Sequence, residues 1–158
     1  MMRRLALAAP LVALLALLPG GMAAGDIPRL DGPWGATSST ALSITGDIAI
    51  GHGRLATRRG ALPMVLTRTG DDGGDPSWIA RAPLRAGRAL MNGNTFCGAG
   101  RQDSARWLTF TALPQSGRGS ASPGLRLMAF QTAQAPAALH GEATPGVCAV
   151  FYFSRRAR

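Results

Sequence analysis

The sequence predicts an all-β fold: a single small antiparallel up-and-down β-barrel of about eight strands with one disulfide. A β-sandwich is the alternative. Short runs of alternating apolar and polar residues are separated by clusters of Gly, Pro, Asp and Ser, and helical periodicity is nearly missing. The run at 147–153 is apolar on both faces. We therefore expect it inside the sheet, where it can close the barrel by pairing with the first strand.

Nine runs are candidate strands, one of which we expect to be a loop or part of a neighbouring strand. The run at 42–50 has apolar residues at even positions, and Gly46-Asp47 in its middle predicts a bulge or bend. The pair Asn92-Gly93 predicts a turn, because both residue types accept positive φ. The candidate strands are residues 34–38, 42–50, 54–57, 62–67, 78–82, 88–91, 106–112, 125–131 and 147–153.

The first 24 residues have the features of an export signal. Arg3 and Arg4 give a positive start, residues 5–18 form an apolar run, and small residues follow at the expected cleavage site. We expect a periplasmic or secreted protein with one domain at 25–154, a basic tail at 155–158 and no stable membrane span after cleavage. An uncleaved membrane anchor is the alternative.

Cys97 and Cys148 are the only cysteines. In an oxidising compartment we expect them to form a disulfide that ties the middle of the chain to its last strand. They lack the Cys-x-x-Cys spacing of redox motifs, which favours a structural role.

The chain has a formal charge of +9, and all 17 of its basic residues are arginine. Codon bias in a GC-rich bacterial genome is one explanation of this composition. The functional alternative is attraction to an anionic surface or an envelope protein. Nucleic acid is not expected as a partner, because the arginines are scattered and are not interleaved with aromatic residues. The candidate contacts with an anionic surface are Arg58, Arg59, Arg155, Arg156 and Arg158.

Several stretches of the sequence partly match nucleotide-binding, metal-binding or catalytic motifs, but none matches completely. Residues 51–56 fit a dinucleotide fingerprint, but the glycine at 60 and the proline at 63 leave no room for the helix that must follow, so a hairpin turn is favoured. The acidic stretch at 71–75 lacks the ligand spacing of a calcium loop. We predict no catalytic residues, no metal and no cofactor. A hydrolase built on His52 or His140, the only imidazoles, is an alternative.

Large apolar side chains on alternating strand positions are expected to form the core. If the barrel instead encloses a cavity, some of them could line it for a small apolar ligand. The predicted core residues are Trp34, Ile44, Ile48, Trp107, Phe110, Leu127 and Phe151, and the candidate lining residues are Trp78, Trp107, Phe110, Met128 and Phe130.

Gly32-Pro33-Trp34 forms a G-x-W motif at the first predicted strand. In this respect the chain resembles the calycins, which include lipocalins, avidins and small periplasmic protease inhibitors of bacteria. The resemblance implies a small barrel in which Trp34 packs across the closed end. From these features we expect a secreted or periplasmic binding protein that acts without catalysis, as a protein-binding or inhibitor module of the envelope. A carrier of a small apolar ligand is the alternative.

Overall fold

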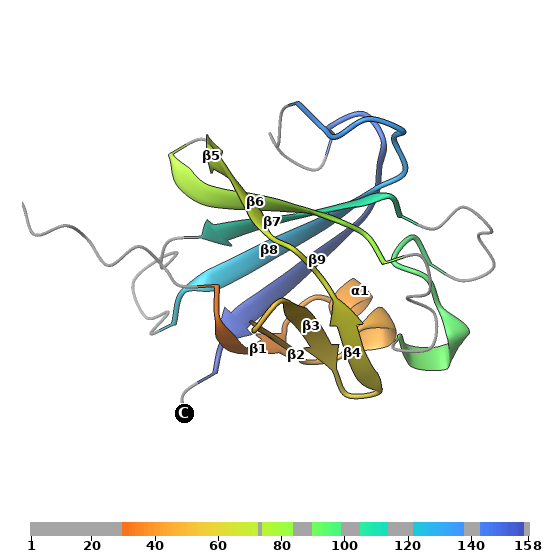
Figure 1. Ribbon diagram of the computed structural model, residues 1–158. Helices are drawn as coiled ribbons and strands as arrows, with labels where there is room; N and C mark the ends of the chain where they lie inside the picture. The colour runs from red at the N-terminus through yellow and green to blue at the C-terminus, as the bar shows by residue number, and fades with distance from the viewer. Residues whose placement is uncertain are drawn as a thin grey trace, which may run out of the picture.

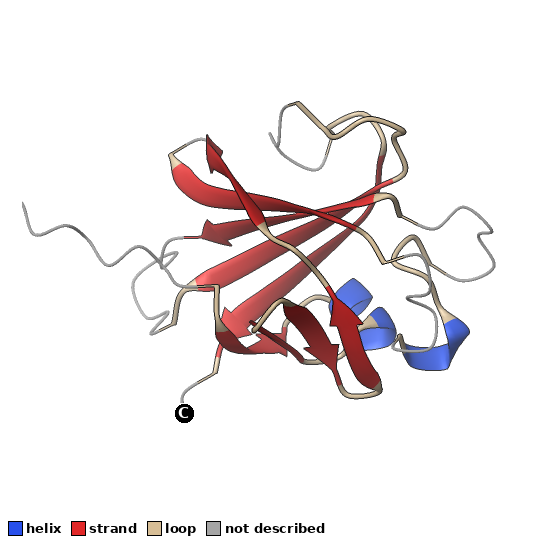
Figure 2. Ribbon diagram, viewed as in Figure 1, coloured by secondary structure: helices blue, strands red, loops and turns tan. Residues whose placement is uncertain are grey.

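The computed structural model describes residues 30–72, 74–83, 90–98, 105–113, 122–137 and 143–156. Within these ranges the chain is nearly all β, with one α-helix and one 3₁₀ turn (Figure 1, Figure 2). The expected signal peptide, His140 and Arg158 lie outside the described residues. In the part of the chain that the structure describes, no helix is long and apolar enough to cross a bilayer.

Nine strands form one antiparallel sheet in the order β4-β3-β2-β1-β9-β8-β7-β6-β5, which curls into a half-barrel (Figure 1). The last strand pairs with the first, and Trp34 of β1 lies opposite Arg155 of β9. The all-β, barrel-like fold that the sequence predicts is therefore confirmed. The strands are β1 (Gly32–Ala36), β2 (Ile48–Gly51), β3 (Arg54–Thr57), β4 (Gly60–Pro63), β5 (Thr67–Asp72), β6 (Asp75–Arg81), β7 (Trp107–Leu113), β8 (Gly124–Phe130) and β9 (Val147–Arg155).

The half-barrel is open between β4 and β5, which are the two edges of the sheet. Because every neighbouring pair is antiparallel, directions alternate along the nine strands, and β4 and β5 therefore run the same way. Only residues 64–66 separate them, far fewer than a parallel crossover needs. β4 and β5 are thus two halves of one extended run, of which the first pairs with β3 and the second with β6.

The main core lies on the concave face of the sheet. Trp78, Phe110, Leu127 and Phe151 occupy directly opposed positions on β6, β7, β8 and β9. They belong to the same apolar cluster as the fully buried Trp34 of β1. A cluster that joins both sides of a curled sheet must lie inside the curl. Of the predicted core residues all are buried except Trp107, which is half-buried on the opposite face.

The predicted strand at 42–50 is wrong in its first half, where the structure has α1 (Ser39–Ile44). The Ser38 hydroxyl accepts a hydrogen bond from the Ala41 N–H at 3.2 Å and so caps the first turn. Gly46, at φ +62°, ends the helix, and its N–H donates to the Ala41 carbonyl at 2.8 Å. The strand begins only after this turn.

Apart from 54–57, the other predicted strands also differ from the observed ones in their bounds. The run at 34–38 begins two residues earlier, and the run at 62–67 spans the break between β4 and β5. The described part of the run at 88–91 leads into the 3₁₀ turn η2 (Met91–Gly93) and not into a strand. Asn92 in this turn has a φ of +55°, which agrees with the positive φ predicted for Asn92-Gly93.

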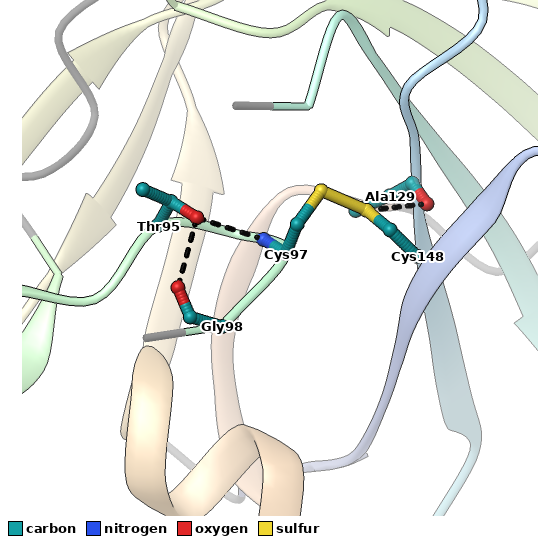
Figure 3. The surroundings of a disulfide bond; sticks show 5 residues. All are labelled: Thr95, Cys97, Gly98, Ala129 and Cys148. Atoms are coloured by element: carbon teal, nitrogen blue, oxygen red, sulfur yellow. Dashed lines mark hydrogen bonds between the residues drawn. A yellow bond between two sulfur atoms is a disulfide. The ribbon is translucent and has the colours of Figure 1, made fainter. Parts of the chain in front are cut away.

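Cys97 and Cys148 form the predicted disulfide, with their Cα atoms 5.1 Å apart (Figure 3). The Thr95 hydroxyl accepts the Cys97 N–H at 3.2 Å and donates to the Gly98 carbonyl at 3.0 Å. These bonds fix a tight turn before the bridge. The disulfide therefore joins an ordered turn to the start of β9.

The disulfide-linked segment 90–98 also covers part of the core. Leu90 and Phe96 are buried, and the Phe96 ring meets Phe151 edge to face with centroids 6.2 Å apart. Asn94 Nδ2 donates to the Ser43 carbonyl at 3.2 Å, which ties the segment to α1. The segment and α1 together close one end of the core.

Candidate binding surface

The half-barrel has two different ends. Strand directions put the connections β1–β2, β3–β4, β6–β7 and β8–β9 at one end. We call this the helix end, because the first of these connections contains α1, and Figure 1 shows α1 and the β3–β4 turn on the same side of the molecule. The opposite end carries the connections β2–β3, β5–β6 and β7–β8 and the start of β1.

Arg58 and Arg59 form the turn between β3 and β4 at the helix end. The Thr57 hydroxyl shapes the turn by accepting the Arg59 N–H at 3.2 Å and donating to the Gly60 carbonyl at 3.3 Å. Both arginine side chains are exposed. Among the described residues no carboxylate forms an ion pair with either one. The turn therefore presents two adjacent positive charges to solvent.

Leu42 gives the helix end an exposed apolar group. It lies on the outer side of α1 and is 56% exposed, whereas Ala41 and Ile44 on the inner side are buried. Among the described residues only Val65 is a more exposed large apolar residue. The sequence pattern did not predict that Leu42 is exposed, because its even-numbered spacing suggested a strand facing the core. The Ser38 cap and Gly46 were the signals for a helix.

Arg155 is not free for a partner. Its guanidinium carbon lies 4.8 Å from the centroid of the Trp34 ring, and its Nη2 donates to the Asp31 carbonyl. The Trp34 indole N–H in turn donates to the Leu30 carbonyl at 2.8 Å. These contacts fix the residues before β1 against the end of β9. Arg155 also belongs to β9, so the predicted tail begins at 156.

Arg156 also has a partner within the chain, in this case a carboxylate. Its Nη2 is 2.7 Å from Asp47 Oδ2, while Asp47 Oδ1 accepts the Ala36 N–H at 2.9 Å. Asp47 thus joins the chain after β9 to the β1–β2 connection. Of the four predicted anionic-surface contacts that the structure describes, only Arg58 and Arg59 are exposed and without a described ion pair.

The five candidate lining residues do not share one face of the sheet. Trp78 and Phe110 are register partners on the concave face. Trp107, Met128 and Phe130 belong to a separate cluster on the convex face, where Trp107 lies opposite Phe130. Residues three apart in a strand point to opposite sides, so Trp107 and Phe110 cannot line the same cavity. The sheet therefore separates Trp78 and Phe110 from the other three candidate lining residues.

The convex face of β7 and β8 is packed. Met128 and Phe130 are fully buried there, and the Arg81 guanidinium carbon lies 4.4 Å from the centroid of the Trp107 ring. Trp107 Nε1 and Thr109 Oγ1 are buried without a hydrogen-bond partner among the described residues. This face therefore carries a second, smaller apolar cluster, in which Met128 and Phe130 are fully buried and Trp107 is half-buried.

His52 lies in the turn between β2 and β3 and is exposed. Its φ is +50° and that of Gly53 is +69°, and positive φ at both central residues is required by a type I′ hairpin. The stretch at 51–56 is thus the hairpin that the sequence favours over a nucleotide loop. Among the described residues no three His, Cys, Asp or Glu side chains gather as metal ligands would.

The chain matches no protein-family model, no curated protein and no solved structure.

Proposed function

We propose that this chain is an exported binding protein of calycin-like form that contacts an anionic partner in the bacterial envelope through its helix end. The main support for this proposal is that Arg58 and Arg59 are both exposed and that no described carboxylate forms an ion pair with either one. Leu42 at the same end adds an exposed apolar contact. Arginine is one of the residue types that are enriched in protein interfaces.

The net charge supports an anionic partner. The whole chain has a formal charge of +9, and removal of Arg3 and Arg4 with the expected signal would leave 15 arginines against 8 acidic residues. A positive field of this size attracts an anionic partner before contact, and the exposed turn then supplies the local charge.

Two features support a calycin-like form. Trp34 of the Gly32-Pro33-Trp34 motif is fully buried in the first strand, and the first strand pairs with the last. The disulfide fits an oxidising compartment, as does the expected signal at 1–24. We therefore place the protein in the periplasm or outside the cell.

The packing of the concave face favours this proposal over a carrier. An interior ligand would need space among Trp34, Phe110, Leu127 and Phe151, and all four side chains are fully buried in one contiguous cluster. Side chains of this kind fill the interiors of small barrels. A hydrolase would need a partner for His52, which stands exposed in a hairpin turn.

The proposal is tested by binding of the oxidised, signal-free protein to two anionic probes, lipopolysaccharide vesicles and soluble poly-glutamate. Retention should fall as added salt shortens the screening length from about 30 Å at 0.01 M to about 8 Å at 0.15 M. Preference for one probe identifies the source of the anionic groups. No retention of either probe at low salt would contradict the proposal, and salt-independent uptake of a fatty acid would favour the carrier.

A further inference from the structure

Asn92 lies at the tip of the turn in segment 90–98 and is followed by Gly93. Both residues are exposed, and their φ angles are +55° and +70°. Within the part of the chain that the structure describes, the Asn92 side chain makes no hydrogen bond. The Asn92 carboxamide is therefore open to attack by a nucleophile.

The nearest main-chain nucleophile is the Gly93 nitrogen, which can close a succinimide ring by attacking Asn92 Cγ. Glycine has no side chain to obstruct the attack. Apart from its chain neighbours, no atom lies within 4 Å of the position that a Cβ of Gly93 would take. The attack requires rotation about the Asn92 Cα–C bond, where ψ is 26° in the turn. The turn is closed by the Asn94 N–H, which donates to the Met91 carbonyl at 3.0 Å, and at an exposed turn such an opening costs little free energy.

Asn94, the only other asparagine of the chain, lacks these features. It is half-buried, and its Nδ2 donates to the Ser43 carbonyl at 3.2 Å. The next residue is Thr95, whose β-branched side chain crowds the nitrogen that would attack. The two asparagines thus form a matched pair within one short segment.

We propose that Asn92 is a site of spontaneous modification, at which this asparagine is converted into isoaspartate and aspartate. The Gly93 nitrogen gives up its proton to hydroxide and forms a bond to Asn92 Cγ. The Cγ–Nδ2 bond breaks, and the amide nitrogen takes up a proton and leaves as ammonia. Water then opens the succinimide: attack at the main-chain carbonyl carbon leaves isoaspartate, and attack at Cγ leaves aspartate. The net reaction consumes one water and releases one ammonia, and it does not depend on the proposed function.

The isoaspartyl product should loosen segment 90–98. Its main chain runs through Cγ, which adds a carbon to the turn that positions Asn94 for its hydrogen bond to Ser43 of α1. The turn also packs against α1, and Figure 1 shows the two side by side. Because segment 90–98 and α1 close one end of the core, we expect the isoaspartyl protein to melt at a lower temperature than the unmodified protein.

Peptide mapping by mass spectrometry tests the proposal on the oxidised, signal-free protein, incubated under native conditions in water enriched in heavy oxygen. After reduction and digestion in ordinary water, the tryptic peptide 89–101 contains both asparagines, and its fragments give the conversion at each. Asn92 should take up heavy oxygen and convert at least about tenfold faster than Asn94, because glycine leaves the attacking nitrogen open and threonine crowds it. The rate should rise with pH, because the attacking nitrogen must lose its proton.

Gly93→Ala should slow the conversion of Asn92 several-fold, because the added methyl group crowds the attacking nitrogen. Gly53→Ala is the matched control. Gly53 lies in another exposed turn with a φ of +69°, so alanine causes similar backbone strain there, but no asparagine precedes it. Gly53→Ala should leave the rate unchanged, and thermal unfolding checks that both variants are folded.

The reduced chain in guanidinium chloride provides the time scale, because no tertiary structure protects Asn92 there. If Asn92 of the native protein stays unmodified while the unfolded chain converts most of it, the turn protects Asn92 and the proposal is wrong. Equal rates at Asn92 and Asn94, or an unchanged rate in folded Gly93→Ala, would overturn it as well. The isoaspartyl protein is separated by chromatography, and a melting temperature equal to that of the unmodified protein would contradict the loosening of segment 90–98.

Discussion

The guanidinium carbon of Arg155 lies 4.8 Å from the centroid of the Trp34 ring. The two residues also lie directly opposite each other in the pairing of β9 with β1. The contact therefore joins the last strand to the first. Arg155 also donates to the Asp31 carbonyl, and Trp34 donates to the Leu30 carbonyl. Arg155 and Trp34 thus hold the residues just before β1 against the end of β9.

Replacement of Arg155 by alanine should lower the free energy of unfolding by about 1–3 kcal/mol, because it removes a cation–π contact and a hydrogen bond. Arg155→Lys should recover only part of the loss, since lysine keeps the charge but not the planar group. Arg54→Ala, at an exposed position, serves as the control. Urea denaturation measures all three, and equal stabilities of Arg155→Ala and the original chain would show that the contact does not stabilise the fold.

Trp34→Ala should cost about 3–5 kcal/mol, because it removes a fully buried large side chain. The same urea titration measures the loss. A cost below about 1 kcal/mol would contradict the burial of Trp34, since core aromatic truncations rarely cost so little.

Loss of the disulfide should lower stability by about 2–5 kcal/mol, because Cys97 and Cys148 close a long loop with a sequence separation of 51. Cys97→Ser/Cys148→Ser is compared with the oxidised chain by urea denaturation, and the chain with reductant added is the second reference. Thiol titration of the unfolded, unreduced protein should find no free thiol. Two free thiols would contradict the bridge.

His52→Asn should raise stability by a few tenths to about 1 kcal/mol, because asparagine tolerates the positive φ of this turn position better than histidine does. His52→Val should lower it, since a β-branched residue is strained there. The difference in melting temperature between the two variants is the readout. If valine were as stable as asparagine, the turn would not have the backbone conformation described here.

Much of the sheet could be predicted from runs of alternating or continuous apolar residues, because strands β6 to β9 are long and lie in the interior of the sheet. α1 could not, because six residues give too short a window for helical periodicity, and Leu42 and Ile44 imitate an alternating strand. Only the cap at Ser38 and the glycine at 46 mark the helix.

The candidate sites depend on contacts that sequence spacing does not contain. That Trp107 and Phe110 face opposite sides follows from their separation in one strand, but that the side of Phe110 is the concave one follows only from the curl of the sheet. Arg155 and Arg156 look like a free basic tail in the sequence. Their partners, Trp34 and Asp47, are more than a hundred residues away along the chain.

Cleavage of the expected signal peptide can be measured directly. If the expected N-terminal signal is removed on export, intact-mass measurement of the secreted or periplasmic protein should place its first residue between Ala24 and Asp26. A membrane-bound product that keeps Met1 would show that the segment is an uncleaved anchor.

A pair of matched variants shows whether the exposed β3–β4 turn binds an anionic partner. Arg54 is the first residue of β3 and Arg59 follows the strand; both are exposed and carry the same charge, but only Arg59 lies in the turn at the helix end. The dissociation constant for the retained anionic probe is measured at low salt for Arg59→Gln, Arg54→Gln and Arg58→Gln/Arg59→Gln. We expect Arg59→Gln to weaken binding several-fold, the double variant to weaken it by at least about tenfold, and Arg54→Gln to change it little. Equal losses for Arg59→Gln and Arg54→Gln would show that net charge alone governs binding, and would contradict a site at the helix end.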